Sequence, residues 1–136
     1  MEVKIVTPSK GRASNVITTK LIHDLTLVVP AKEVDEYKEH NPNVEIIAEP
    51  DHVRGITASR QFILETFDNV FMIDDDIISM RCLYTEEGEE YAITDPVDVK
   101  GLIQRCADIA SDVGAKMFGF ANLRSPAHYV LSLIHI

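Results

Sequence analysis

Three consecutive carboxylates, Asp74, Asp75 and Asp76, follow the apolar run Phe71-Met72-Ile73 and could bind a metal ion. Carboxylates this close repel one another, and a hard divalent cation removes that repulsion. Mg²⁺ or Mn²⁺ typically takes one or two carboxylates together with substrate phosphates. If the strand continues through the triplet, Asp74 and Asp76 face one side and Asp75 the other, so we assign the metal to Asp74 and Asp76. A solvated turn or a helix N-cap is the structural alternative.

A second candidate segment runs from Thr7 to Ala13, directly after an apolar run near the N-terminus. The Ser9 hydroxyl, the Arg12 guanidinium and the backbone amides of such a turn suit a nucleotide base and its phosphates. An ordinary turn between a strand and a helix explains the composition equally well. Lys10 is expected to be a solvated loop residue.

A third candidate is Arg60, which follows Gly55 by five residues. Gly55 permits a tight turn, and Arg60 then lies on the first or second turn of a helix, within reach of a diphosphate or of the Asp triplet. The structural alternative is a surface cation paired with Glu65 or Asp68. His52 has no second ligand at metal-binding spacing, so we expect it to have no such role.

Strand-like and helix-like runs alternate along the part of the chain that carries these candidates. Strands are expected at residues 3–7, 25–29, 44–48 and 70–73, and helices at residues 13–23, 32–40 and 57–67. This alternation predicts an α/β fold, a parallel sheet with helices on both faces. Because open parallel sheets bind ligands at the carboxyl ends of their strands, the three candidate segments are expected to meet at one edge.

A longer helix is expected at residues 96–113. Asp95 is suited to the N-cap, Pro96 to the first helical position and Gly114 to the position after the last turn. Residues 117–121 are then expected to form another strand. The acidic run at residues 86–90 is interpreted as the solvated tip of a hairpin.

The composition restricts the class of protein. The chain has 136 residues, 46% of them hydrophobic, and a formal net charge of −9. The size suits one domain, and the charge disfavours tight direct binding of duplex DNA. No apolar run reaches the roughly 18 residues of a membrane span, and the N-terminus does not resemble a signal peptide. Cys82 and Cys106 have no metal or disulfide spacing, so we expect reduced thiols and a cytoplasmic protein.

The last six residues, 131–136, need a separate interpretation. Their sequence, LSLIHI, corresponds codon by codon to a transposon end that is used in preparing sequencing libraries. We therefore expect a translated adaptor there, with residues 1–130 forming the N-terminal part of a single domain that continues beyond Val130 in the natural protein. A genuine terminal strand is the alternative.

Together these features resemble the GT-A class of nucleotide-sugar glycosyltransferases, family 2 in particular. The resemblance covers about residues 3–121 and is carried by Pro8-Ser9-x-x-Arg12, by Gly55 with Arg60, and by the Asp-x-Asp of Asp74 to Asp76. The first of these, with Gly119-Phe120-Ala121-Asn122, is most like small bacteriophage-encoded glycosyltransferases, some of which are thought to glucosylate hydroxymethylated pyrimidines in DNA.

The resemblance implies a Rossmann-like, mostly parallel sheet with strand order 3-2-1-4 and a nucleoside-diphosphate sugar as donor. It also implies a metal-dependent reaction with Mn²⁺ or Mg²⁺, an acceptor of the modified-DNA type, and no membrane partner. Asp74 and Asp76 would bind the metal. The predicted donor-binding residues are Pro8, Ser9, Arg12, Arg60, Asp74 and Asp75.

The sequence departs from the family pattern at two places. The second strand ends Val29-Pro30-Ala31, without the Asp that common members use against the base. The catalytic base of inverting members lies later in the chain, and no residue before Val130 matches it. A sugar-phosphate nucleotidyltransferase and a non-catalytic nucleotide-binding α/β domain remain as alternatives. The first would carry a richer glycine loop than Lys10-Gly11-Arg12.

Overall fold

A computed structural model of the chain describes residues 2–82 and 91–121. The main sheet consists of four parallel strands in the order β3-β2-β1-β4. These are β1 Lys4–Pro8, β2 Thr26–Pro30, β3 Glu45–Glu49 and β4 Val70–Met72. The strands begin and end within two residues of the expected positions, and the expected strand order is confirmed.

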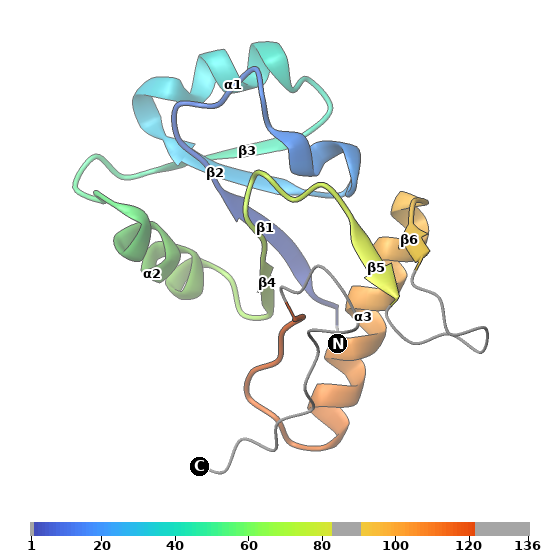
Figure 1. Cartoon of the computed structure of the whole chain (residues 1–136). Helices are drawn as coiled ribbons and strands as arrows, with labels where there is room; N and C mark the ends of the chain where they lie inside the picture. The colour runs from blue at the N-terminus through green and yellow to red at the C-terminus, as the bar shows by residue number, and fades with distance from the viewer. Residues whose placement is uncertain (1, 83–90, 122–136) are drawn as a thin grey trace.

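Helices cover both faces of this sheet, because successive strand residues face opposite sides. Ile5 and Leu27 pack on one face with Tyr37 of α1 (Val34–His40) and Ile103 of α3 (Pro96–Asp112). Val6 and Val28 pack on the other face with Ile63 of α2 (Ile56–Thr66). Figure 1 shows β1 and β4 between α2 and α3. The structure therefore has the predicted α/β architecture.

Short connections lead from β2, β3 and β6 into the helices that follow them. A 3₁₀ turn, η2 (Ala31–Glu33), leads from β2 into α1. Gly55 precedes α2 with φ 86° and ψ 162°, a backbone conformation that a residue with a Cβ rarely adopts. Asp95 caps α3 as expected, since its side chain accepts a hydrogen bond from the backbone N–H of Val97.

The prediction of a helix at residues 13–23 is wrong. This segment contains only the 3₁₀ turn η1 (Ile17–Lys20). Its backbone bonds to the loop of the Asp triplet instead of to itself: the N–H groups of Ile17 and Thr18 both donate to the carbonyl oxygen of Asp75. The Thr18 hydroxyl also donates to the Asp74 carbonyl oxygen and accepts from the Ile77 N–H. These long-range partners, together with β-branched residues that favour a helix weakly, prevent a regular helix.

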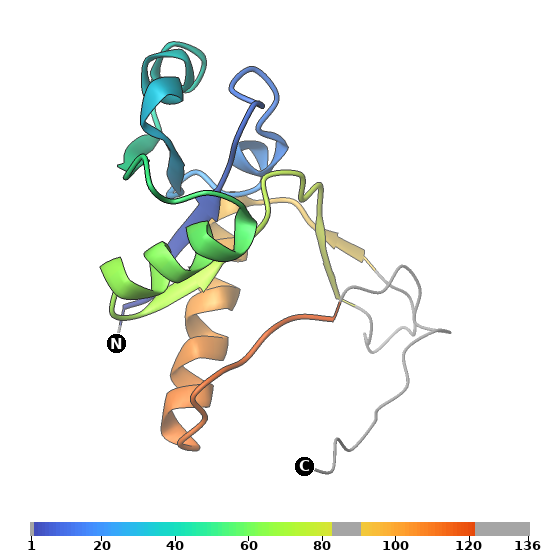
Figure 2. The same cartoon turned by 90° about the vertical axis from the view of Figure 1, so that its left-hand side faces the viewer.

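The prediction of a strand at residues 117–121 is also wrong. Figure 2 shows that the chain continues as coil after the end of α3. Phe118 and Phe120 contact Phe71 through their rings, each with a centroid separation of 5.7 Å. The alternation that suggested a strand therefore reflects aromatic packing without backbone pairing.

A short antiparallel pair, β5 (Met80–Cys82) and β6 (Tyr91–Ile93), was not predicted. The expected hairpin tip at residues 86–90 and the expected tail at residues 131–136 lie outside the described residues. None of the described helices is long and apolar enough to cross a membrane. Cys82 and Cys106 are not joined in a disulfide.

Candidate active site

A pocket of about 920 Å³ lies at the carboxyl ends of the parallel strands. This size is within the usual range for small-molecule sites. The turn after β1, the ends of β2 and β3, the start of α2 and the Asp loop after β4 all contribute to its lining. Every residue predicted for the donor or the metal lines this pocket: Pro8, Ser9, Arg12, Arg60, Asp74, Asp75 and Asp76. The structure therefore brings all of these residues together, while their roles remain predictions.

The lining is electrically balanced, although the chain as a whole is acidic. Five cations and five carboxylates surround the pocket, whereas the chain has 13 basic and 22 acidic residues. The cations are Lys10, Arg12, Lys32, Arg54 and Arg60; the carboxylates are Glu49, Asp51, Asp74, Asp75 and Asp76. Compared with the rest of the surface, this is a favourable environment for an anion such as a diphosphate.

The geometry of the Asp triplet differs from the expected alternation. β4 ends at Met72, and Asp75 and Asp76 lie in a turn, so strand geometry does not decide which way they face. The Asp75 side chain is 13% exposed, against 58% for Asp74 and 57% for Asp76. Asp75 is thus held inside the loop while its two neighbours are accessible to solvent.

Asp75 is the acceptor at the end of a chain of hydrogen bonds. Its Oδ2 accepts from the Ser9 hydroxyl at 2.7 Å, and its Oδ1 lies 3.2 Å from the Arg12 guanidinium. Ser9 Oγ is also 2.7 Å from Tyr37 Oη. Because Ser9 gives its proton to Asp75, Tyr37 must donate to Ser9. Tyr37 Oη in turn accepts from the backbone N–H of Arg12 at 3.1 Å.

Sequence reasoning missed Tyr37, although its hydroxyl joins the turn after β1 to the Asp loop. Its side chain is fully buried. Burial raises the pKa of Tyr37, and the hydrogen bonds with Ser9 and Arg12 offset part of that rise. Tyr37 is therefore protonated at neutral pH and able to donate. A tyrosine on the buried face of the predicted helix 32–40 was the available signal, since a buried phenol needs a polar partner.

The turn after β1 has a second fixed point at Gly11. Gly11 has φ 69°, in the left-handed region that favours glycine. Its N–H donates to Glu33 Oε1 at 2.6 Å. The conformation of the turn is therefore set by contacts to the α1 region, and it presents Arg12 toward the Asp loop.

Arg60 lies where the sequence placed it, in the second turn of α2. Its guanidinium is 3.2 Å from Asp74 Oδ1, so the alternative partners Glu65 and Asp68 are not used. Gly55 and Ile56, at the start of α2, also line the pocket. The free N–H groups and the dipole of this helix end favour a negative group there.

No group of three or more His, Cys, Asp or Glu side chains within residues 2–82 and 91–121 is arranged to hold a metal ion by itself. Asp74 and Asp76 remain the accessible carboxylates of the triplet. His52 is exposed, and Lys10 is exposed at the rim of the pocket. Glu49 at the end of β3 is a further buried carboxylate that the sequence interpretation did not single out.

Comparison with known proteins identifies the family of the chain. The sequence model of a family described as TET-Associated Glycosyltransferase matches residues 3–122. This match covers the sheet, α2, the Asp loop and α3. No curated protein and no solved structure matches the chain. Since the family match extends over most of the sequence, the chain belongs to the TET-associated glycosyltransferases and is a glycosyltransferase.

Proposed function

We propose that this glycosyltransferase takes its sugar from a nucleoside-diphosphate donor, in a reaction that depends on Mg²⁺ or Mn²⁺. The observation that carries the proposal is the convergence of two Arg–Asp contacts, Arg12 with Asp75 and Arg60 with Asp74, in one pocket at the carboxyl edge of the sheet. The start of α2 lies at the same pocket. Guanidinium groups and helix N-termini are both well suited to binding phosphates.

The donor set of the Asp loop fits a divalent cation. Asp74 and Asp76 offer carboxylate oxygens to the solvent, and Mg²⁺ commonly takes one or two carboxylates and completes its shell with phosphate oxygens and water. Asp74 and Asp76 would hold the ion, and Asp75 would fix the loop that carries them. When bound, the ion would stabilise the negative charge that develops on the departing diphosphate.

The arginines have a separate task in this proposal. Arg12 and Arg60 are half exposed, and each is neutralised by an aspartate. When a diphosphate enters, their guanidinium groups can turn to its oxygens while the aspartates remain nearby. The hydrogen bonds from Tyr37 and Ser9 keep Asp75 in place during that exchange.

For the acceptor we propose a hydroxymethylated pyrimidine of phage DNA, reached in the bacterial cytoplasm. The family description associates these enzymes with TET, and the Pro8-Ser9-x-x-Arg12 turn supports a phage-type transferase. The charge of −9 opposes tight duplex binding by the chain alone. Lys10, Lys32 and Arg54 at the pocket make no ion pair with any described carboxylate, so this rim is where DNA would approach.

Donor binding tests the proposal most directly. Calorimetric titration with uridine and guanosine diphosphate sugars, with and without Mn²⁺, should show affinity that increases with the metal. Asp76→Asn keeps the size of the side chain and removes its charge. It should lower affinity in the presence of Mn²⁺ by about tenfold or more, as for loss of a contact to a charged group.

Asp68→Asn is the matched control, because Asp68 is an exposed aspartate that does not line the pocket. This variant should bind the donor with the metal dependence of the parent. Donor binding that is equally tight with and without Mn²⁺ in the parent would contradict the proposed metal dependence.

A further inference from the structure

The carboxylate of Glu49 is buried at the wall of the pocket, and no residue that the structure describes donates a hydrogen bond to it. Glu49 is the last residue of β3, is 6% exposed and lines the pocket. Its Oε2 accepts no hydrogen bond from any described residue. A buried oxygen in this condition is costly, because it has lost its water without gaining a donor.

The surrounding backbone offers few donors to Glu49. Glu49 lies opposite Pro30 in the register of β2 and β3, and Pro50 follows it in the chain. Pro8, at the end of β1, also lines the pocket. Proline has no backbone N–H, so three positions at this edge of the sheet cannot donate to a carboxylate.

The glutamate at the other end of the same strand has hydrogen-bond partners within the chain. Glu45, the first residue of β3, accepts from Lys4 Nζ and from the Thr26 hydroxyl, both at 2.9 Å. Both glutamates belong to the same strand, but only the one outside the pocket has partners of its own within the described residues. The lack of a hydrogen-bond donor at Glu49 therefore goes together with its position in the pocket.

We propose that Glu49 binds the nucleoside half of the donor by accepting hydrogen bonds from two adjacent donor groups. This inference rests on the proposed function. The phosphate-binding groups lie near β1, β4 and α2, and a carboxylate would repel phosphate. β3 is three strand positions from β4, roughly 14 Å at the usual spacing of strands. The nucleoside, rather than the diphosphate, is the part of the donor that should reach Glu49.

Two parts of a nucleoside present adjacent donors to a carboxylate. Guanine offers N1–H and the exocyclic amino group on one edge, and ribose offers its 2′ and 3′ hydroxyls. The pyrimidine uracil offers a single N–H. The shared chemistry is a pair of N–H or O–H groups, and the choice of nucleotides distinguishes the two sources.

The experiment measures binding of GDP, UDP and 2′,3′-dideoxy-GDP to the full chain by calorimetry, with Mn²⁺ present. Glu49→Gln should weaken binding of GDP by about tenfold to a hundredfold, the usual effect of losing a hydrogen bond to a charged group. If guanine is the source, the parent prefers GDP to UDP and the variant loses that preference. If the ribose is the source, the parent binds GDP and UDP alike, and removing the hydroxyls has the same effect as the substitution.

Thermal unfolding without nucleotide separates binding from stability. Removing an unsatisfied buried charge should leave the Tm of Glu49→Gln equal to that of the parent or raise it. Glu45→Gln, the control on the same strand, should bind GDP normally. Loss of affinity together with a lower Tm in Glu49→Gln would assign Glu49 to stability and overturn the proposal.

Two further outcomes are distinct. If Glu49→Gln binds all three nucleotides as tightly as the parent, the role of Glu49 is wrong and the proposed function stands. If the folded parent binds no nucleotide, both the proposed function and the proposed role of Glu49 are wrong.

Discussion

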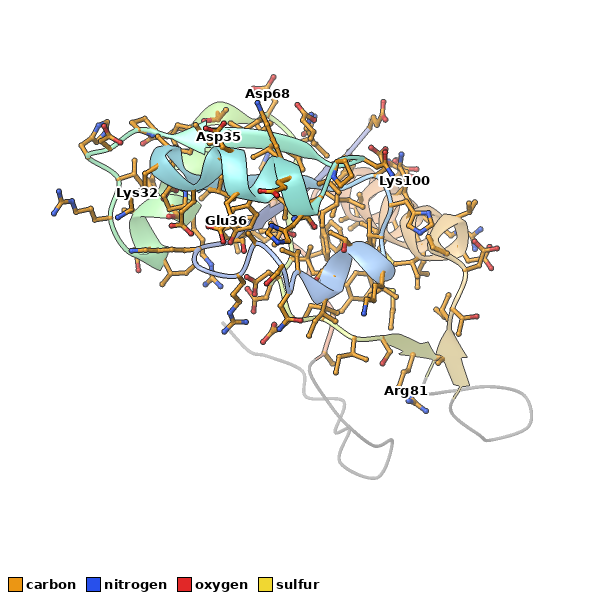
Figure 3. The ribbon with its side chains drawn as sticks, turned by 90° about the horizontal axis from the view of Figure 1, so that it is seen from above. Lys32, Asp35, Glu36, Asp68, Arg81 and Lys100 are labelled. Atoms are coloured by element: carbon orange, nitrogen blue, oxygen red, sulfur yellow. The ribbon has the colours of Figure 1, made fainter. Side chains whose placement is uncertain are left out.

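The polar side chains at the two ends of the parallel sheet differ in whether they have partners within the chain. At the amino end, Lys4 pairs with Glu45, Lys100 pairs with Asp24, and the Val3 N–H donates to the Gln104 side chain. At the carboxyl end, Glu49 has no described partner, and Lys10, Lys32 and Arg54 make no ion pair with a described carboxylate. A second, smaller cleft lies at the amino end and is lined by Lys100, whereas Lys32 lines the pocket at the carboxyl end. These two lysines lie on opposite sides of the molecule in Figure 3.

The difference indicates what each end contributes. Groups at the amino end have partners within the chain, so they stabilise the fold and leave little for a ligand. Groups at the carboxyl end include carboxylates and cations whose hydrogen-bonding capacity is not used up. A folded chain tolerates such groups where binding requires them, at some cost in stability. Asp75 is the clearest exception at this end, because its side chain is only 13% exposed and it accepts from Ser9 and Arg12 of its own chain.

Asp75→Asn tests that exception and should have the largest effect on stability. The substitution removes the charge that accepts from Ser9 and faces Arg12, on a side chain that is only 13% exposed. The free energy of unfolding should fall by about 2 kcal/mol, as for loss of a hydrogen bond to a charged group. Urea unfolding at neutral pH measures it.

Asp76→Asn is the control for that measurement. Asp76 is 57% exposed and lies 4.0 Å from Arg12, so its substitution should change the free energy of unfolding by less than about 0.5 kcal/mol. Equal losses of stability in the two variants would remove the distinction between a fixed Asp75 and an accessible Asp76.

Tyr37→Phe should have an intermediate effect. It removes the hydroxyl that donates to Ser9 and accepts from the Arg12 N–H, and the cost should be about 1 kcal/mol. Combined with Ser9→Ala, the loss should be smaller than the sum of the two single losses, because both variants interrupt the same chain of hydrogen bonds. A double-mutant cycle in urea checks this. Strict additivity would show that Tyr37 and Ser9 act independently.

Several features of the molecule were accessible from the sequence for a physical reason. Local sequence signals predict the strands and α3. Continuous apolar runs indicate the strands, and helical periodicity with an N-cap at Asp95 indicates α3. Parallel topology then brings Ser9, Arg60 and Asp74 to one edge, although they are far apart in the chain. Local pattern and a general rule of topology were enough for these features.

The remaining features depend on contacts between distant segments, which no local pattern records. The backbone of Ile17 and Thr18 forms hydrogen bonds with Asp75, nearly sixty residues away, and so does not form the expected helix. The Asp triplet follows the end of β4 at Met72, so strand alternation does not decide which way its side chains face. Tyr37 and Glu49 gain their importance from burial beside the pocket, which only the assembled sheet defines.

Glu45→Gln tests the amino end and should have the smallest effect. The hydrogen bonds from Lys4 and then Thr26 lower the pKa of Glu45 below its ordinary value of 4.5. A lowered pKa in the folded state means that the ionised form stabilises the fold above about pH 4.5, and that this stability is lost as the pH falls through the folded-state value. Because Lys4 and Glu45 are 41% and 55% exposed, the loss in free energy of unfolding at pH 7 should be no more than about 1 kcal/mol.

Urea unfolding measures this loss. The free energies of unfolding of parent and variant should differ at pH 7, and the difference should shrink at pH 3 and in high salt. A difference that is the same at both pH values would mean that the charge of Glu45 contributes nothing, and that the two ends of the sheet are less different than their contacts indicate.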